Sequence, residues 1–79
     1  MKLYELQFDV VEPMIIFETF SNFGLKMINF YSLKNTDCIT FEGTYDQLKR
    51  WSMEYYDFSE NEFGDYFDDW SKLVRNKND

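Results

Sequence analysis

No disulfide or zinc site within this chain can hold it folded, and this restricts the chain to folds with a well-packed core. Cys38 is the single cysteine, so no intramolecular disulfide can form, and a chain with one cysteine and no histidine cannot build a structural zinc site. A chain of 79 residues makes one domain and buries only ~60% of the surface that its unfolded form exposes. Aromatic residues, 22% of the chain, supply the rich core that such a chain needs. We therefore expect one domain over residues 1–79, without a metal.

The same residue inventory argues against an enzyme. The commonest acid–base group near neutral pH is missing, and the glycines Gly24, Gly43 and Gly64 are too widely spaced for a phosphate-binding loop. Cys38 lies in an apolar run, where a small buried residue is more common than a nucleophile. Catalytic carboxylate pairs need a cleft that separates their pKa values, and a compact domain offers little room for one. We predict no catalytic residues and no cofactor.

The net charge of −7 predicts a basic partner. Nucleic acid and anionic membrane surfaces would be repelled, because both are bound through lysine and arginine. No apolar run approaches the ~20 residues of a membrane span, and the amino terminus has the pattern of a strand instead of a signal peptide. We expect a cytoplasmic protein, monomeric or homodimeric, that binds a basic protein such as a nuclease or another nucleic-acid-binding protein.

The amino-terminal half predicts a strand followed by a helix. From Leu3 to Val10 apolar and polar residues alternate, as in a strand with one buried face. Pro13 then suits the first position of a helix, and the apolar residues of 14–23 recur at spacings of three and four before Gly24. A strand is the alternative over 14–23, because its first part is locally apolar and aromatic.

Two further strands follow, over 25–31 and 38–42, joined by a polar connection that suits a hairpin. Period-two alternation places Ile28 and Phe30 on one side of the first of these strands and Met27 and Tyr31 on the other. One side would face the core, and the other would be exposed apolar surface or a face that binds a second subunit.

Two capping boxes predict the helices of the carboxy-terminal half. Thr44 with Gln47 begins the first helix, and Ser59 with Glu62 begins the second. The first helix has a buried stripe of Tyr45, Leu48, Trp51 and Tyr55. The second is predicted to continue to the end of the chain, with the basic residues of its last turns complementing the helix dipole and with a buried stripe formed by Phe63, Tyr66, Phe67, Trp70, Leu73 and Val74.

The predicted element order is therefore β-α-β-β-α-α. Hairpin-linked strands with helices on one face indicate an α+β two-layer sandwich. The order resembles a ferredoxin-like core whose last strand is replaced by a carboxy-terminal helix.

An acidic stretch from Glu54 to Asp69 contains no lysine or arginine and is the candidate functional surface. Its acids would steer a basic partner, and its aromatics would add anchoring area. The predicted partner-binding residues are Glu54, Tyr55, Tyr56, Asp57, Phe58, Glu60, Glu62, Asp65, Asp68 and Asp69. An ordinary solvated helix face is the alternative. An EF-hand-like loop over 57–68 is disfavoured, because Glu62 replaces the turn glycine and the second capping box begins a helix there.

Composition and one local pattern resemble known protein groups. Alanine is absent and lysine outnumbers arginine six to two, as in proteins of AT-rich genomes. With its small size and acidity, the chain resembles small accessory proteins of bacteriophages, including DNA-mimicking, anti-restriction and anti-CRISPR inhibitors. Residues 54–56, Asn61 and 69–70 also resemble the acids and aromatics with which barstar-type inhibitors fill a basic nuclease site.

These resemblances imply a non-enzymatic, phage-encoded inhibitor or modulator that acts in the host cytoplasm. Two alternatives stay open. One is a structural or assembly protein that oligomerises through its sheet face with Met27, Tyr31 and Thr40. The other is an antitoxin or immunity protein that neutralises a nuclease.

Overall fold

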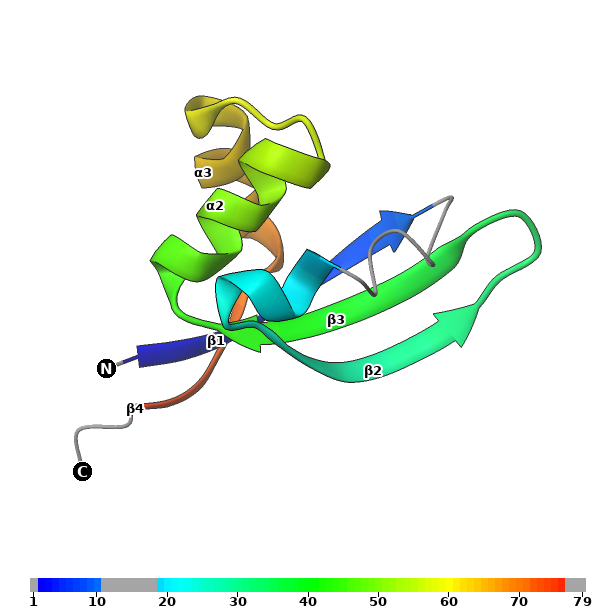
Figure 1. Ribbon diagram of the computed structural model, residues 1–79, viewed down its shortest axis with the longest axis horizontal. Coiled ribbons are helices and arrows are strands. Elements are labelled where there is room, and N and C mark those ends of the chain that lie inside the picture. The colour runs from blue at the N-terminus through cyan, green and yellow to red at the C-terminus, as the bar shows by residue number, and fades with distance from the viewer. Residues whose placement is uncertain (1, 11–18, 77–79) are drawn as a thin grey trace.

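The computed structural model describes residues 2–10 and 19–76 and shows an α+β fold, with two helices packed on one face of a four-stranded antiparallel sheet (Figure 1). The strands are β1 (Lys2–Val10), β2 (Lys26–Ser32), β3 (Asp37–Gly43) and β4 (Lys72–Asn76). The helices are α2 (Tyr45–Tyr55) and α3 (Glu60–Trp70), and a short 3₁₀ helix, η1, spans Phe20–Phe23. The order across the sheet is β2-β3-β1-β4. The predicted α+β class is therefore confirmed, whereas the predicted element order is not, because the chain ends in a strand.

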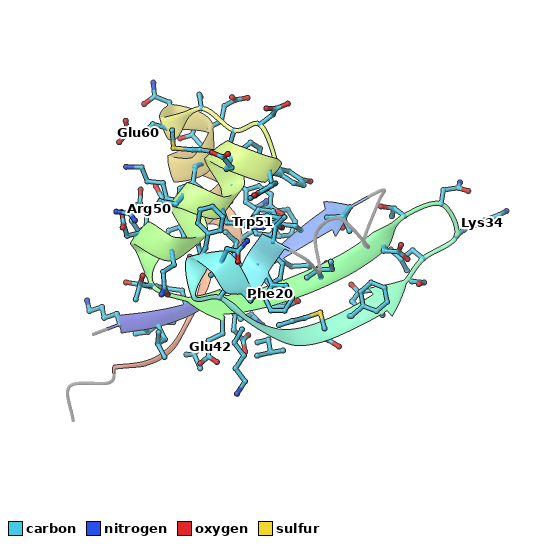
Figure 2. The ribbon with its side chains drawn as sticks, viewed as in Figure 1. Phe20, Lys34, Glu42, Arg50, Trp51 and Glu60 are labelled. Carbon is cyan, nitrogen blue, oxygen red and sulfur yellow. The ribbon has the colours of Figure 1, made fainter. Side chains whose placement is uncertain are left out.

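The core lies between the helices and one face of β1 and β3. Alternate residues of the two strands point toward the helices and are buried, as the period-two pattern predicted. They meet Leu48 and Trp51 of α2 and Phe63 and Phe67 of α3. The buried strand residues of this cluster are Leu6, Phe8, Val10, Ile39 and Phe41. Figure 2 shows Trp51 and Phe20 on this side of the sheet and Glu42 on the other.

Both predicted capping boxes are present. The Thr44 hydroxyl accepts a hydrogen bond from the backbone N–H of Gln47, whose side chain accepts one from the backbone N–H of Thr44. Ser59 and Glu62 make the same reciprocal pair at the start of α3. Each box satisfies two backbone donors that the first helical turn leaves without partners, so local sequence is sufficient to place these helix starts.

The predicted helix over 14–23 is described only at its end. Residues 14–18, for which a strand was the alternative to a helix, lie outside the described residues. The end at Gly24 is confirmed, because its φ of 76° is left-handed and its N–H closes the last turn. That last turn is 3₁₀, and Phe20 stacks on Phe41 with ring centroids 5.4 Å apart.

The prediction that the last helix continues through Val74 is wrong. Helix α3 ends at Trp70, and the next residues form β4, antiparallel to β1, so a fourth strand is present where a helix was predicted. Leu73 and Val74 are exposed, so burial does not explain this strand. Backbone hydrogen bonding to β1 explains the strand, because β1 would otherwise leave a row of backbone donors and acceptors unpaired along one edge. Lys72 consequently lies in a strand and does not complement the dipole of α3.

The predicted division of β2 into two faces is also wrong. Met27 pairs with Phe41 and Asn29 with Thr40, so Ile28 is an extra residue, a β-bulge. A bulge shifts the alternation by one residue. Met27 therefore lies on the helix side, packed against the core, whereas Tyr31 lies opposite Cys38 on the other side.

Two glycines should respond to alanine with opposite signs. A Cβ at Gly43 would lie 2.5 Å from Leu25 Cδ2, and Leu25 is itself buried, so we expect Gly43→Ala to destabilise the fold by about 1–3 kcal/mol. A Cβ at Gly64, inside α3, would meet no heavy atom within 4 Å, and Gly64→Ala should stabilise by about 0.5–1 kcal/mol. Urea midpoints of both variants measure this. A stabilising Gly43→Ala would contradict the close packing of β3 against Leu25.

Candidate functional site

The predicted partner-binding residues lie along the end of α2, the connection after it, and α3. The connection turns at Asp57, whose φ of 59° is left-handed, and the backbone N–H groups of Tyr56 and Phe58 both donate to the Ser52 carbonyl. We call this region, residues 54–69, the acidic helical surface. Chain continuity and this compact turn thus bring the predicted residues onto one layer of the molecule.

All seven acids of the acidic helical surface are exposed, and they differ in what they contact. Glu60 makes an ion pair with Lys49, 2.7 Å from carboxylate to ammonium, and this hydrogen bond lowers the pKa of Glu60. The Glu62 carboxylate accepts the Ser59 backbone N–H, which lowers its pKa likewise. No ion pair among the described residues involves the other acids of this surface, which are Glu54, Asp57, Asp65, Asp68 and Asp69.

Two of the three predicted aromatic anchors pack inward. The Tyr56 hydroxyl donates to the Asp9 carbonyl over 2.9 Å, and the Tyr56 ring lies 5.0 Å from that of Phe8. Phe58 packs between Tyr56 and Tyr66, with centroid distances of 4.9 Å and 5.3 Å. Tyr55 keeps 40% of its surface exposed. Aromatic contact area on the acidic helical surface is therefore concentrated at Tyr55.

The residues of the EF-hand-like pattern do not form a loop. Helix α3 begins at Glu60, so Asn61, Asp65 and Asp68 are spread along a helix. Within 2–10 and 19–76, no group of three or more acidic or cysteine side chains is placed to hold a metal ion.

A second candidate site lies on the sheet face that the helices leave uncovered. It is a hollow of about 690 Å³ to which all four strands and the end of α3 contribute. We call it the sheet-face hollow. Its lining residues are Glu5, Gln7, Ile28, Asn29, Thr40, Glu42, Trp70, Lys72 and Val74. Period-two alternation predicted that Glu5 and Gln7 point away from the core, but β4 and the bulge at Ile28 were not predictable, so the hollow was missed.

Cys38 is buried on the uncovered side of the sheet, as expected for a small core-like residue. Its thiol donates a hydrogen bond to Asp9 Oδ1 over 3.1 Å, and this bond raises the pKa of Cys38. The thiolate, which is the nucleophilic form, is thereby disfavoured. Cys38 consequently contributes packing and a hydrogen bond to this face of the sheet.

In the part of the chain that the structure describes, no helix is long and apolar enough to cross a membrane. No protein-family model, curated protein or solved structure matches this chain.

Proposed function

We propose that this protein is a non-enzymatic binding protein that captures a basic protein partner through the acidic helical surface. The observation that carries the proposal is the group of exposed acids on α2, α3 and their connection, of which Glu60 alone has an ion pair with a described residue. Unpaired surface carboxylates raise the association rate with a positively charged partner and disfavour acidic partners.

The aromatic contacts refine how this surface would bind. Tyr56 and Phe58 hold the connection between the helices against the core, and Tyr55 offers exposed ring surface beside Glu54. We infer that Tyr55 is the aromatic anchor and that the acids of α3 provide steering. A phage-encoded inhibitor acting in a bacterial cytoplasm on a nucleic-acid-handling protein is the proposed biological setting.

The strand order supports a finer proposal about the fold. Strand β3 lies between β1 and β2, and β1 lies between β3 and β4. Strands β1 and β2, and likewise β3 and β4, are therefore consecutive in the chain but separated by one strand in the sheet. We propose that the fold is a ferredoxin-like variant with two helices in its second connection. This fold hosts unrelated functions, so the proposal about binding depends on the surface alone.

Self-association through the sheet face is less well supported. Among its three predicted residues, Met27 lies on the opposite face of the sheet. The centre of the uncovered face consists of Glu5, Gln7 and Thr40 together with the buried Glu42. Obligate homodimer interfaces are more apolar than this, with charged residues depleted from their centres.

Charge reversal at one acid tests the proposed function. A partner is first captured from a bacterial lysate at low salt and purified. Asp65→Lys should then slow association with it by roughly tenfold at low ionic strength and by much less at high ionic strength, because steering is electrostatic and is screened by salt. The measurement is the association rate at the two ionic strengths.

A matched control separates local from overall charge. Asp37→Lys makes the same change in net charge at the start of β3, away from the helices, and should slow association far less. Equal effects of the two variants, with circular dichroism showing both folded, would contradict the acidic helical surface as the contact.

A further inference from the structure

The charges at the sheet-face hollow balance across the sheet. Glu5 of β1 and Glu42 of β3 are register partners, and Figure 2 shows Glu42 directed away from the helices. Lys72 of β4 is the other register partner of Glu5, and Lys26 of β2 is the other register partner of Glu42. These residues form one row across the four strands, with two carboxylates between two ammonium groups, so the formal charges of the row sum to zero. Such a row gives no net attraction to a charged guest, whereas an uncharged guest leaves its opposite-charge neighbours undisturbed.

A second row of the same hollow consists of uncharged polar side chains. Thr40 of β3 is the register partner of both Gln7 of β1 and Asn29 of β2, and all three residues line the hollow. Adjacent strands lie ~4.8 Å apart, so these side chains follow one another at about that spacing. The Gln7 amide donates to the Tyr31 hydroxyl over 3.2 Å, which leaves its carbonyl oxygen as an acceptor. Two amides and a hydroxyl can both donate and accept, which suits a guest that carries hydroxyl groups.

Trp70 supplies an aromatic wall to the same hollow. It is the last residue of α3 and keeps 64% of its surface exposed, with its ring 6.2 Å from that of Tyr66. Ile28 and Val74 add partly exposed aliphatic surface to the lining. A large exposed indole buries much apolar area when a flat guest stacks on it, and tryptophans are enriched among residues that dominate binding energies. The hollow therefore combines a stacking surface with a row of uncharged hydrogen-bonding groups.

We propose that the sheet-face hollow binds an uncharged carbohydrate, such as a short oligosaccharide. A sugar ring has an apolar C–H face that would stack on Trp70. Its rim of hydroxyl groups would exchange hydrogen bonds with Gln7, Asn29 and Thr40. The volume of the hollow, about 690 Å³, lies within the ~300–1,000 Å³ typical of small-molecule sites. This site lies on the face of the sheet away from the helix layer, and it goes beyond the proposed function without depending on it.

The charge of the protein selects among guests of this shape. With a net charge of −7, the protein repels phosphate and carboxylate groups, so nucleotides and acidic sugars are disfavoured. Stacking and hydrogen bonding to an uncharged guest depend little on ionic strength, whereas the steering of a basic protein by the acidic helical surface is screened by salt. Salt dependence therefore separates the two kinds of binding.

The test uses the whole chain and three uncharged trisaccharides, which are maltotriose, cellotriose and triacetylchitotriose. Glycerol, which offers hydroxyls without a ring face, and trigalacturonate, which adds carboxylates to the sugar, are the comparison solutes. The Trp70 indole N–H signal in NMR is the reporter, with the buried Trp51 indole, which donates to Thr19, as the internal control. We expect a saturable shift of the Trp70 signal with at least one of the uncharged trisaccharides and none with the comparison solutes. The dissociation constant should be on the order of 1 mM at both low and high salt.

Variants then assign the response to the hollow. Thr40→Val keeps the shape of the side chain and removes its hydroxyl, and it should weaken binding about fivefold, as expected for the loss of one hydrogen bond. Trp70→Ala should weaken binding about tenfold, followed on the side-chain amide signals of Gln7. Leu73→Ala is the matched control, because Leu73 is an exposed apolar residue of β4 outside the lining of the hollow and should leave the affinity unchanged. Asp65→Lys should also leave it unchanged, and Thr40→Val should not slow association with the captured basic partner, so either proposal can fail while the other holds.

Several outcomes would overturn the proposal. The hollow would not be a sugar site if none of the three trisaccharides shifted the Trp70 signal at about tenfold the expected dissociation constant. An equal response to glycerol or trigalacturonate would exclude recognition of an uncharged sugar ring. Thr40→Val binding with parental affinity would exclude the polar row as the contact. A stronger response to adenosine than to every trisaccharide would identify a nucleobase as the occupant, and a Trp70 shift that depends on protein concentration alone would identify a second copy of the chain.

Discussion

Replacing Phe8 by alanine is expected to destabilise the fold by about 3–5 kcal/mol, which is comparable to the whole stability of about 5–15 kcal/mol that small domains possess. Phe8 is fully buried, and its ring is 4.9 Å from Trp51, 5.0 Å from Tyr56 and 5.5 Å from Tyr66. It therefore connects the central strand to both helices and to the connection between them. The cavity that alanine leaves cannot close without moving all of these rings.

The urea midpoint, followed by circular dichroism, measures this loss. Leu33→Ala is the control, because Leu33 lies in the β2–β3 connection with 53% of its surface exposed and should change stability by no more than about 0.5 kcal/mol. A Phe8→Ala midpoint as close to that of the parent as the control would show that this ring is not at the centre of the core.

Stability is also expected to fall as the pH rises from about 10 to about 12, because of Tyr66. Burial of its ring raises the pKa of the Tyr66 hydroxyl to about 12, and that hydroxyl donates a hydrogen bond to the Gln7 carbonyl. Burial raises the pKa of Tyr56 as well. A raised pKa means that the folded state holds the proton more tightly than the unfolded state. The resulting stability is complete below the unfolded pKa of about 10 and is lost as the pH approaches the folded value.

Tyr66→Phe tests this assignment. The variant should lose about 1 kcal/mol at pH 7 together with the hydrogen bond to Gln7. Between pH 10 and about 12 it should decline less than the parent, by about 1–2 kcal/mol once the partial exposure of the ring is allowed for. Urea midpoints across this range measure both effects. A variant that declines as steeply as the parent would show that another group causes the alkaline loss.

Elements that depend on near neighbours in the chain were predictable. The helix starts at Thr44 and Ser59 follow from reciprocal hydrogen bonds between residues three apart, and the turn at Gly24 follows from its freedom to adopt a positive φ. The buried face of β1 follows from strict alternation. The exposed acids of α3 follow from the same kind of local pattern, because polar residues lie between the members of its apolar stripe.

Features that depend on pairing between distant segments were not predictable. Leu73 and Val74 continue the helical spacing of α3, but the free edge of β1 recruits them as a strand, because the backbone pairing that this edge offers outweighs local preference. The bulge at Ile28 depends on the register with β3, which a single strand does not reveal.

The two candidate sites differ in the same way, since one depends on neighbouring residues and the other on distant segments of the chain. The acidic helical surface is a property of consecutive residues and is evident from their order in the chain. The sheet-face hollow exists only because β1 and β3 place Glu5 opposite Glu42 and because α3 ends where Trp70 meets the sheet. An aromatic core, two capped helices and an acidic face could be predicted from the order of residues, since each depends on residues a few positions apart. The set of distant side chains that share one hollow could not be predicted in this way, because strand register and the end of α3 are set by contacts across the fold.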